Sequence, residues 1–174
     1  GAAVASHPNI KEILNYIHEK GGEVSFSSLR ADVLNEEKLN LLFQSGHKTL
    51  TLAPETGSEN LRKKINKTLT DEKLYQTLKT ALQVGFREFR LYLMIGLPHE
   101  TDEDILAGVD MINRIADKIR PLGGKLTVSV NPLIPKPHTP LQIYSINEED
   151  EIKRKYEMLI SPFYKSSLVS FKTE

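Results

Sequence analysis

The chain has 174 residues, of which 39% are hydrophobic and 26% charged, as in ordinary globular proteins. Lysine and arginine number 23, as do aspartate and glutamate, so the charge balance gives no general signal for nucleic-acid binding, which needs a basic face. No apolar run approaches the roughly 18 residues of a membrane span, and no secretory signal is present, so we expect a cytoplasmic protein without a membrane partner. Cysteine is absent, which excludes disulfides and thiolate metal sites within these residues.

Short strand-like runs alternate with longer helical segments along the chain. The predicted strands cover residues 23–28, 48–53, 88–95 and 125–131, and a helix with one apolar face is predicted over 104–120. A further helix is expected near 147–160 and a strand near 167–172. This alternation predicts an α/β fold with a parallel sheet. We expect one domain over 1–174, with a barrel core over 1–141 and a carboxyl-terminal extension over 142–174.

Capping residues mark the expected helix boundaries. Four residues that can cap a helix each precede acidic residues, as at the first turn of a helix: Asn35, Thr70, Thr101 and Asn147. Thr56 followed by Glu59 has the spacing of a capping box. Glycines fall between a helix and the next strand and predict helix ends: Gly21, Gly46, Gly85 and Gly123.

The predicted strands are apolar on one face only. Because side chains alternate between the faces of a strand, Leu50 and Leu52 share one face while Thr49 and Thr51 share the other. The polar face is continued by the following residues: Ser25, Ser27, Ala53, Arg90, Tyr92, Met94, Thr127, Ser129 and Asn131. A closed barrel would fill its interior with branched aliphatic side chains. We therefore expect an open, partial TIM-type barrel whose polar lumen holds water, cofactor or substrate.

Glu55 follows one of these strands in phase with the polar face, at the rim where barrel enzymes carry out chemistry. A carboxylate there can accept both hydroxyls of a ribose, and Thr56 or Ser58 can add a hydrogen bond. The alternative is that Thr56 and Glu59 only cap the next helix and leave Glu55 in solvent.

A second strand-loop-helix junction contains Gly96, Leu97 and Pro98. Glycine allows close approach of the backbone to a flat ring, and proline fixes the turn. In the loop after the first rim helix, Lys67 can place an ammonium near a ligand carboxylate, although a single loop lysine is usually only solvated.

Several further polar residues are candidates for substrate contacts. Arg30 and Asp32 lie at the rim, where a structural ion pair is an equally good interpretation. The proline-rich segment 131–140 predicts a rigid rim loop. The substrate candidates are Arg30, Asp32, Arg90, Tyr92, Asn131, Lys136 and His138. No residue set has metal-ligand spacing, so we expect no metal site formed by these residues alone.

Five motifs occur in an order and at spacings that resemble the radical S-adenosylmethionine (radical SAM) enzymes. They are LRAD at 29–32, APETGSE at 53–59, INK at 65–67, IGLPHET at 95–101 and PKPHTP at 135–140. The resemblance covers residues 1 to about 141 and is closest to the branch in which a cobalamin-binding domain often precedes the barrel. It implies a six-stranded partial barrel that binds S-adenosylmethionine on a four-iron four-sulfur cluster.

The resemblance also implies roles for individual residues. Glu55, with Thr56 or Ser58, would meet the ribose, and Lys67 would approach the methionine carboxylate. Gly96, Leu97 and Pro98 would line the adenine, and the opening residues 1–3 would end a strand near the methionine amino group. The cluster's C-x3-C-x2-C loop has no counterpart in this sequence.

The missing cysteines favour a chain that is the carboxyl part of a longer radical SAM protein, inactive alone, in which an uncovered strand edge near Val4 invites self-association. Cobalamin would belong to an upstream domain. The alternative is a cluster-free barrel that binds a nucleotide or serves as an interaction module. An unrelated barrel enzyme for phosphorylated substrates ranks last, because a glycine-rich phosphate loop is missing.

Overall fold

The computed structural model describes residues 7–24, 26 and 29–173, and within these ranges the strands form one parallel sheet. In spatial order the strands are β1 (Thr49–Glu55), β2 (Glu88–Ile95), β3 (Lys125–Pro132) and β4 (Val169–Lys172). The predicted strands at 48–53, 88–95, 125–131 and 167–172 are confirmed in type and in parallel pairing. The chain has the expected α/β fold.

The strand expected at 23–28 is not found among the residues that can be compared. Residues 25, 27 and 28 lie outside the described ranges, and Glu23, Val24 and Phe26 are not in a strand. Leu29 makes a single parallel bridge to Leu52 of β1. The expectations about residues 1–5, the edge at Val4 included, also fall outside the described ranges.

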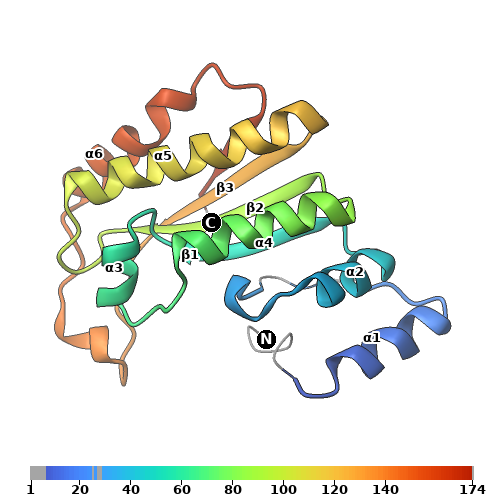
Figure 1. The fold of residues 1–174 in the computed structure, drawn as a ribbon. Helices are drawn as coiled ribbons and strands as arrows, with labels where there is room; N and C mark the ends of the chain where they lie inside the picture. The colour runs from blue at the N-terminus through green and yellow to red at the C-terminus, as the bar shows by residue number, and fades with distance from the viewer. Residues whose placement is uncertain (1–6, 25, 27–28, 174) are drawn as a thin grey trace.

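The helices gather on one side of the sheet (Figure 1). Helices α4 (Asp71–Val84) and α5 (Asp102–Ile119) lie across it, and α6 (Glu149–Ile160) lies beside α5. The remaining helices are α1 (Ile10–Glu19), α2 (Glu36–Gln44) and the short α3 (Glu59–Lys64), with 3₁₀ turns at Ala31–Val33, Arg120–Leu122, Pro140–Ile143 and Ser161–Phe163. Within the described ranges, no helix combines the length and apolar character that crossing a bilayer requires.

Most of the predicted helix boundaries are confirmed. The side chains of Asn35, Thr70 and Thr101 accept backbone N–H groups at the starts of α2, α4 and α5. The Thr56–Glu59 capping box is wrong, because Ser58 is the N-cap of α3 and accepts the N–H of Leu61. Asn147 is not a cap either, since α6 begins after Glu148. The four glycines predicted to end helices all have positive φ: Gly21, Gly46, Gly85 and Gly123.

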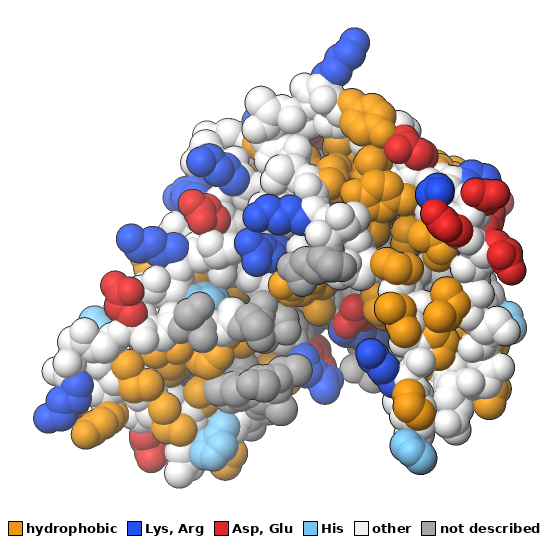
Figure 2. All heavy atoms as spheres, turned by 180° about the vertical axis from the view of Figure 1, so that it is seen from behind, with side chains coloured by type: hydrophobic (Ala, Val, Ile, Leu, Met, Phe, Trp, Pro, Cys, Tyr) orange, Lys and Arg blue, Asp and Glu red, His pale blue; other side chains and the backbone are white. Residues whose placement is uncertain are grey.

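The register of the sheet confirms one apolar and one polar face. Thr51 lies opposite Arg90, which lies opposite Thr127, and the next residue of each strand is apolar. The apolar face is buried in the core: Leu50, Leu52, Phe89, Leu91, Leu93, Ile95, Leu126, Val128 and Val130. Seen from the side opposite to the helices, the molecule has a hollow that contains charged side chains of both signs (Figure 2).

Candidate functional site

The carboxyl end of β1 departs from regular strand geometry at Glu55. Leu52 lies opposite Leu91, whereas Glu55 lies opposite Leu93, so β1 contains one extra residue, a bulge. Glu55 also has a φ of 71°, the left-handed conformation that few residues other than glycine adopt. Such conformations cost about 1–3 kcal/mol and concentrate at functional sites. The bulge and the positive φ make Glu55 a candidate functional residue.

Glu55 and Lys67 meet at a cavity of about 390 Å³ at this end of the sheet. Lys67 Nζ lies 2.6 Å from Glu55 Oε1, and both side chains are about one quarter exposed. The cavity is lined by Arg30, Ala31, Asp32, Ala53, Glu55, Ile65, Asn66, Lys67, Thr68, Leu69, Met94, Leu97 and Leu141. Its volume lies in the range of small-molecule sites. The structure thus brings together two residues that the sequence placed in separate motifs.

A fully buried arginine fixes the backbone that carries this pair. The guanidinium of Arg62, on α3, donates to the carbonyl of Thr56 (2.7 Å) and to that of Leu69 (2.8 Å), and it pairs with Asp71. It therefore joins the loop after β1, helix α3 and the segment that leads into α4. Glu55 and Lys67 lie on the two segments that Arg62 holds together.

Arg30 and Asp32 line the same cavity and pair with each other. The guanidinium donates from Nε (3.1 Å) and Nη2 (2.5 Å) to the two carboxylate oxygens. These hydrogen bonds lower the pKa of Asp32, and the nearby charge of Lys67 lowers it further. Their interpretation as an ion pair is confirmed, and the cavity wall now contains two carboxylates and two cations.

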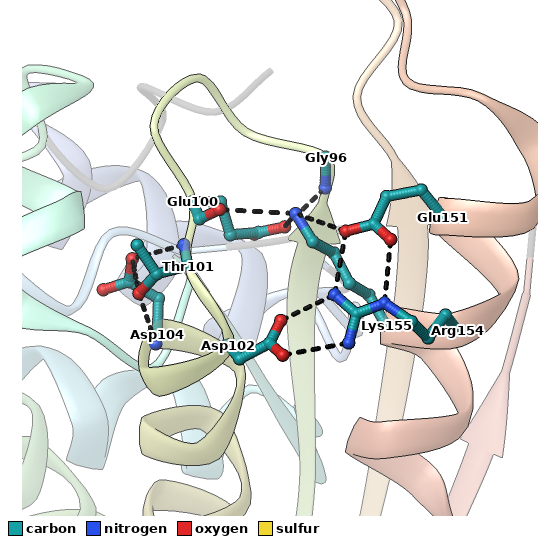
Figure 3. A network of polar contacts seen from close by, with 8 residues as sticks. All are labelled: Gly96, Glu100, Thr101, Asp102, Asp104, Glu151, Arg154 and Lys155. Carbon is teal, nitrogen blue, oxygen red and sulfur yellow. Dashed lines mark hydrogen bonds and ion pairs between the residues drawn. The ribbon is translucent and has the colours of Figure 1, made fainter.

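The junction after β2 is built differently. Gly96 has a φ of 80°, and its N–H donates to Glu100 Oε2 over 2.8 Å. Leu97 is buried and lines the cavity that also contains Glu55. Glu100 in turn pairs with Lys155 of α6 (3.1 Å), and both side chains are at least 95% buried (Figure 3). The loop that was expected to face a flat ring is therefore held by a buried ion pair.

The other candidate residues lie away from the Glu55–Lys67 cavity. Thr56 and Ser58 face the start of α3, where their hydroxyls accept N–H groups.

Arg90 and Tyr92 line a separate cavity of about 780 Å³ toward the amino ends of the strands. Asn131 lies at the end of β3, whereas Lys136 and His138 are exposed in the following loop. Gly96 and Pro98 line a third cavity, of about 300 Å³, with Leu97 between it and the first.

Three residues that support the site were not predicted from the sequence: Arg62, Glu100 and Lys155. A contact between two glycines was not predicted either. A Cβ on Gly57 would lie 2.2 Å from the backbone of Gly108 in α5, so the loop after β1 rests directly on that helix. Glu100 could have been identified from its place in the motif GLPHET at 96–101, directly after the Gly-Leu-Pro turn. Arg62 and Lys155 sit in ordinary charged runs that carry no such signal.

The titratable residues that the structure describes differ from the ligand sets of metal sites. Among the described residues, no group of histidine, aspartate and glutamate could hold a metal ion, and the sequence contains no cysteine. A four-iron four-sulfur cluster, which needs thiolate ligands, therefore does not fit the residues of this chain.

Comparisons with known proteins show the family of this chain. A family model described as the radical SAM superfamily matches residues 1–112. An uncharacterized protein of Methanocaldococcus jannaschii is 38% identical over 154 residues, 88% of this chain and 33% of that protein. The heme chaperone HemW of Bacillus subtilis is 27% identical over 94 residues, 53% of this chain and 25% of that protein. The chain thus spans a third or less of the length of these relatives.

Two solved structures have a similar fold. Coproporphyrinogen III oxidase (HemN) of Escherichia coli, described as a radical SAM enzyme, gives a TM-score of 0.63 at 17% identity over 90% of this chain and 36% of that one. SuiB of Streptococcus suis gives 0.62 at 17% identity over 98% and 37%. The four parallel strands with their helices thus resemble the barrel of HemN.

Proposed function

We propose, given that the chain belongs to the radical SAM superfamily, that it forms the S-adenosylmethionine-binding part of a radical SAM barrel. The observation that carries the proposal is the Glu55–Lys67 pair, held on a strained bulge at a ligand-sized cavity. Such a cavity at the carboxyl ends of parallel strands is where barrel proteins bind their ligands.

The polar groups at the cavity match the polar groups of S-adenosylmethionine. The Glu55 carboxylate is an acceptor for the two ribose hydroxyls, and the Lys67 ammonium is a partner for the methionine carboxylate. Leu97, buried beside them, offers an apolar surface for the adenine. Thr56 and Ser58 take a smaller part, because their hydroxyl oxygens already accept backbone N–H groups.

When bound, S-adenosylmethionine would supply the 5′-deoxyadenosyl group for radical chemistry, with Glu55 and Lys67 holding its ribose and its methionine carboxylate. Any cluster ligands would have to come from residues other than these 174, which contain no cysteine. The role proposed for this chain is therefore binding and orientation of the nucleoside. The substrate-contact residues, a cytoplasmic location and self-association through a strand edge remain predictions.

We do not propose a cobalamin-dependent branch for this protein. The named proteins similar to this chain include a heme chaperone and, among the structural neighbours, a coproporphyrinogen oxidase, which favour a different branch. The absence of cysteine supports a second candidate function, a cluster-free nucleotide-binding barrel. A reading frame that encodes a C-x3-C-x2-C motif upstream would favour the first candidate, and a frame that lacks it would favour the second.

The proposal is tested by titrating the chain with S-adenosylhomocysteine in a calorimeter. Glu55→Gln keeps the shape of the side chain but loses its charge, so we expect the Kd to rise about tenfold. Glu59→Gln is the matched control: Glu59 accepts the N–H of Asp71 and pairs with Lys63, outside the cavity lining. An unchanged Kd in Glu55→Gln, or equal losses in both variants, would reject the assignment.

A further inference from the structure

Helix α6 lies beyond the residues that the family model matches, yet it contacts the loop after β2 through a buried charge. Lys155 Nζ lies 3.1 Å from Glu100 Oε2 and 3.4 Å from the Glu100 carbonyl oxygen. The side chains are 5% and 1% exposed, respectively. Taking two charges out of water costs several kcal/mol per ion unless their pairing and hydrogen bonds compensate. Apolar replacements of buried ion pairs are often neutral or stabilising, so stability alone does not account for such a pair. The geometry that it holds is the alternative.

The geometry that the pair holds is that of Gly96. Glu100 Oε2, the oxygen that meets Lys155, also accepts the N–H of Gly96 at 2.8 Å. The same helix limits the loop sterically, because a Cβ on Gly96 would lie 2.9 Å from the end of the Ile152 side chain. Lys155 therefore orients the carboxylate that fixes the Gly96 amide, and Leu97 follows directly in the cavity wall.

The neighbouring residue on α6 makes a contact of another kind. Arg154 pairs with Asp102 at the start of α5 (2.6 Å) and with Glu151 of its own helix (2.8 Å). These side chains are roughly half exposed, and their ion pairs do not reach residues 96–98, although Glu151 also lies 3.7 Å from Lys155 Nζ (Figure 3). Arg154 thus tethers α6 to α5, whereas Lys155 connects α6 to the rim.

We propose that Lys155 is a positioning residue for the rim loop Gly96-Leu97-Pro98, acting through Glu100 from a helix outside the matched part of the family. The proposal rests on the proposed function, because the loop borders the cavity assigned to S-adenosylmethionine. Lys155 does not touch the ligand. It holds the Glu100 carboxylate where the Gly96 N–H needs it, so the nucleoside meets a preorganised loop.

The test combines amide hydrogen exchange of Gly96, followed by NMR, with titration of S-adenosylhomocysteine. In Lys155→Met we expect Gly96 exchange to quicken at least about tenfold and the Kd to rise about fivefold. In Arg154→Met, the matched control, both should stay near the wild-type values. In the double variant Glu100→Gln with Lys155→Met, the amide oxygen still accepts the Gly96 N–H without needing a cation. Slow exchange should return.

The outcomes separate this proposal from the proposed function. Unchanged Gly96 exchange in Lys155→Met, or an equal change in Arg154→Met, would overturn the positioning role. If Lys155→Met does not fold, the double variants decide: Glu100→Gln with Lys155→Met should protect Gly96, and Glu100→Ala with Lys155→Met should not. Equal exchange in those two would also overturn it. A wild-type chain that binds no S-adenosylhomocysteine would reject the proposed function, while Gly96 exchange would still test the contact.

Discussion

The loops after β1 and β2 each contain a left-handed residue and are held by buried side chains of opposite charge. Each turns through a left-handed residue, Glu55 with φ 71° and Gly96 with φ 80°, and each is fixed by one buried charged side chain. After β1 the buried cation Arg62 donates to loop carbonyls, whereas after β2 the buried anion Glu100 accepts a loop amide. The first loop thus presents the carboxylate of Glu55, whose backbone is strained, to the cavity, and the second presents Leu97.

The two junctions also differ in where their support comes from. Arg62 and its partners all lie between Thr56 and Asp71, so the first junction is built by one stretch of chain. Glu100 depends on Lys155, far along the sequence in α6. The junction after β1 is therefore formed locally, whereas the junction after β2 depends on the docking of helix α6. Three substitutions test this difference between the junctions.

The largest effect is expected from Arg62→Met. The substitution keeps the apolar volume but leaves the carbonyls of Thr56 and Leu69 without their buried donor, each costing about 1–3 kcal/mol. We expect the free energy of unfolding in urea to fall by about 3 kcal/mol or more. Lys63→Met, next to it on α3 but exposed, should change it by less than about 0.5 kcal/mol. Similar losses in both variants would contradict a local role for Arg62.

A smaller loss is expected from Gly57→Ala. Its Cβ would lie 2.2 Å from the backbone of Gly108, which cannot move aside as a side chain can. Overpacking of this kind costs about 1–3 kcal/mol, measurable by urea unfolding. Gly108→Ala probes the contact from the other side and should be near neutral. Its Cβ meets only the end of Leu159, at 3.1 Å, and alanine favours the helix. Equal losses would show that the loop does not rest on α5 in this way.

The smallest effect concerns the pH dependence of the second junction. Burial raises the pKa of Glu100 above the usual 4.5, and the hydrogen bonds from Gly96 and Lys155 offset this only in part. A raised pKa in the folded state gives stability that is present below the unfolded pKa and lost as pH rises through the folded value. The free energy of unfolding of Glu100→Gln, relative to the wild type, should therefore increase from pH 4 upward. A decrease would mean that Lys155 dominates the pKa.

The parts of the fold that depend on local chemistry could be predicted from the sequence. Alternation of Thr49, Leu50 and Thr51 predicted the faces of β1, and Thr101 predicted the start of α5. The cap at Thr56 was wrong because Thr56 is still in the loop fixed by Arg62, so that α3 starts after Ser58.

The candidate site was predictable only in part. Glu55, Lys67 and Leu97 were named from their motifs, and all three line one cavity. The supports of that cavity could not be named, since the partners of Arg62 include backbone carbonyls and Lys155 meets Glu100 only once α6 is docked. Arg90 and Tyr92 have the predicted face but line a different cavity, because they lie further from the carboxyl end of β2.

The central claim is that the loops after β1 and β2 both contribute to a single nucleoside site. The most direct measurement is a ¹H–¹⁵N NMR titration of the chain with S-adenosylhomocysteine. We predict that the signals of Glu55, Lys67 and Leu97 shift together along one binding curve, while those of Lys48 and Arg90 at the other cavity stay in place. Shifts confined to Lys48 and Arg90, or to one rim without the other, would contradict the account.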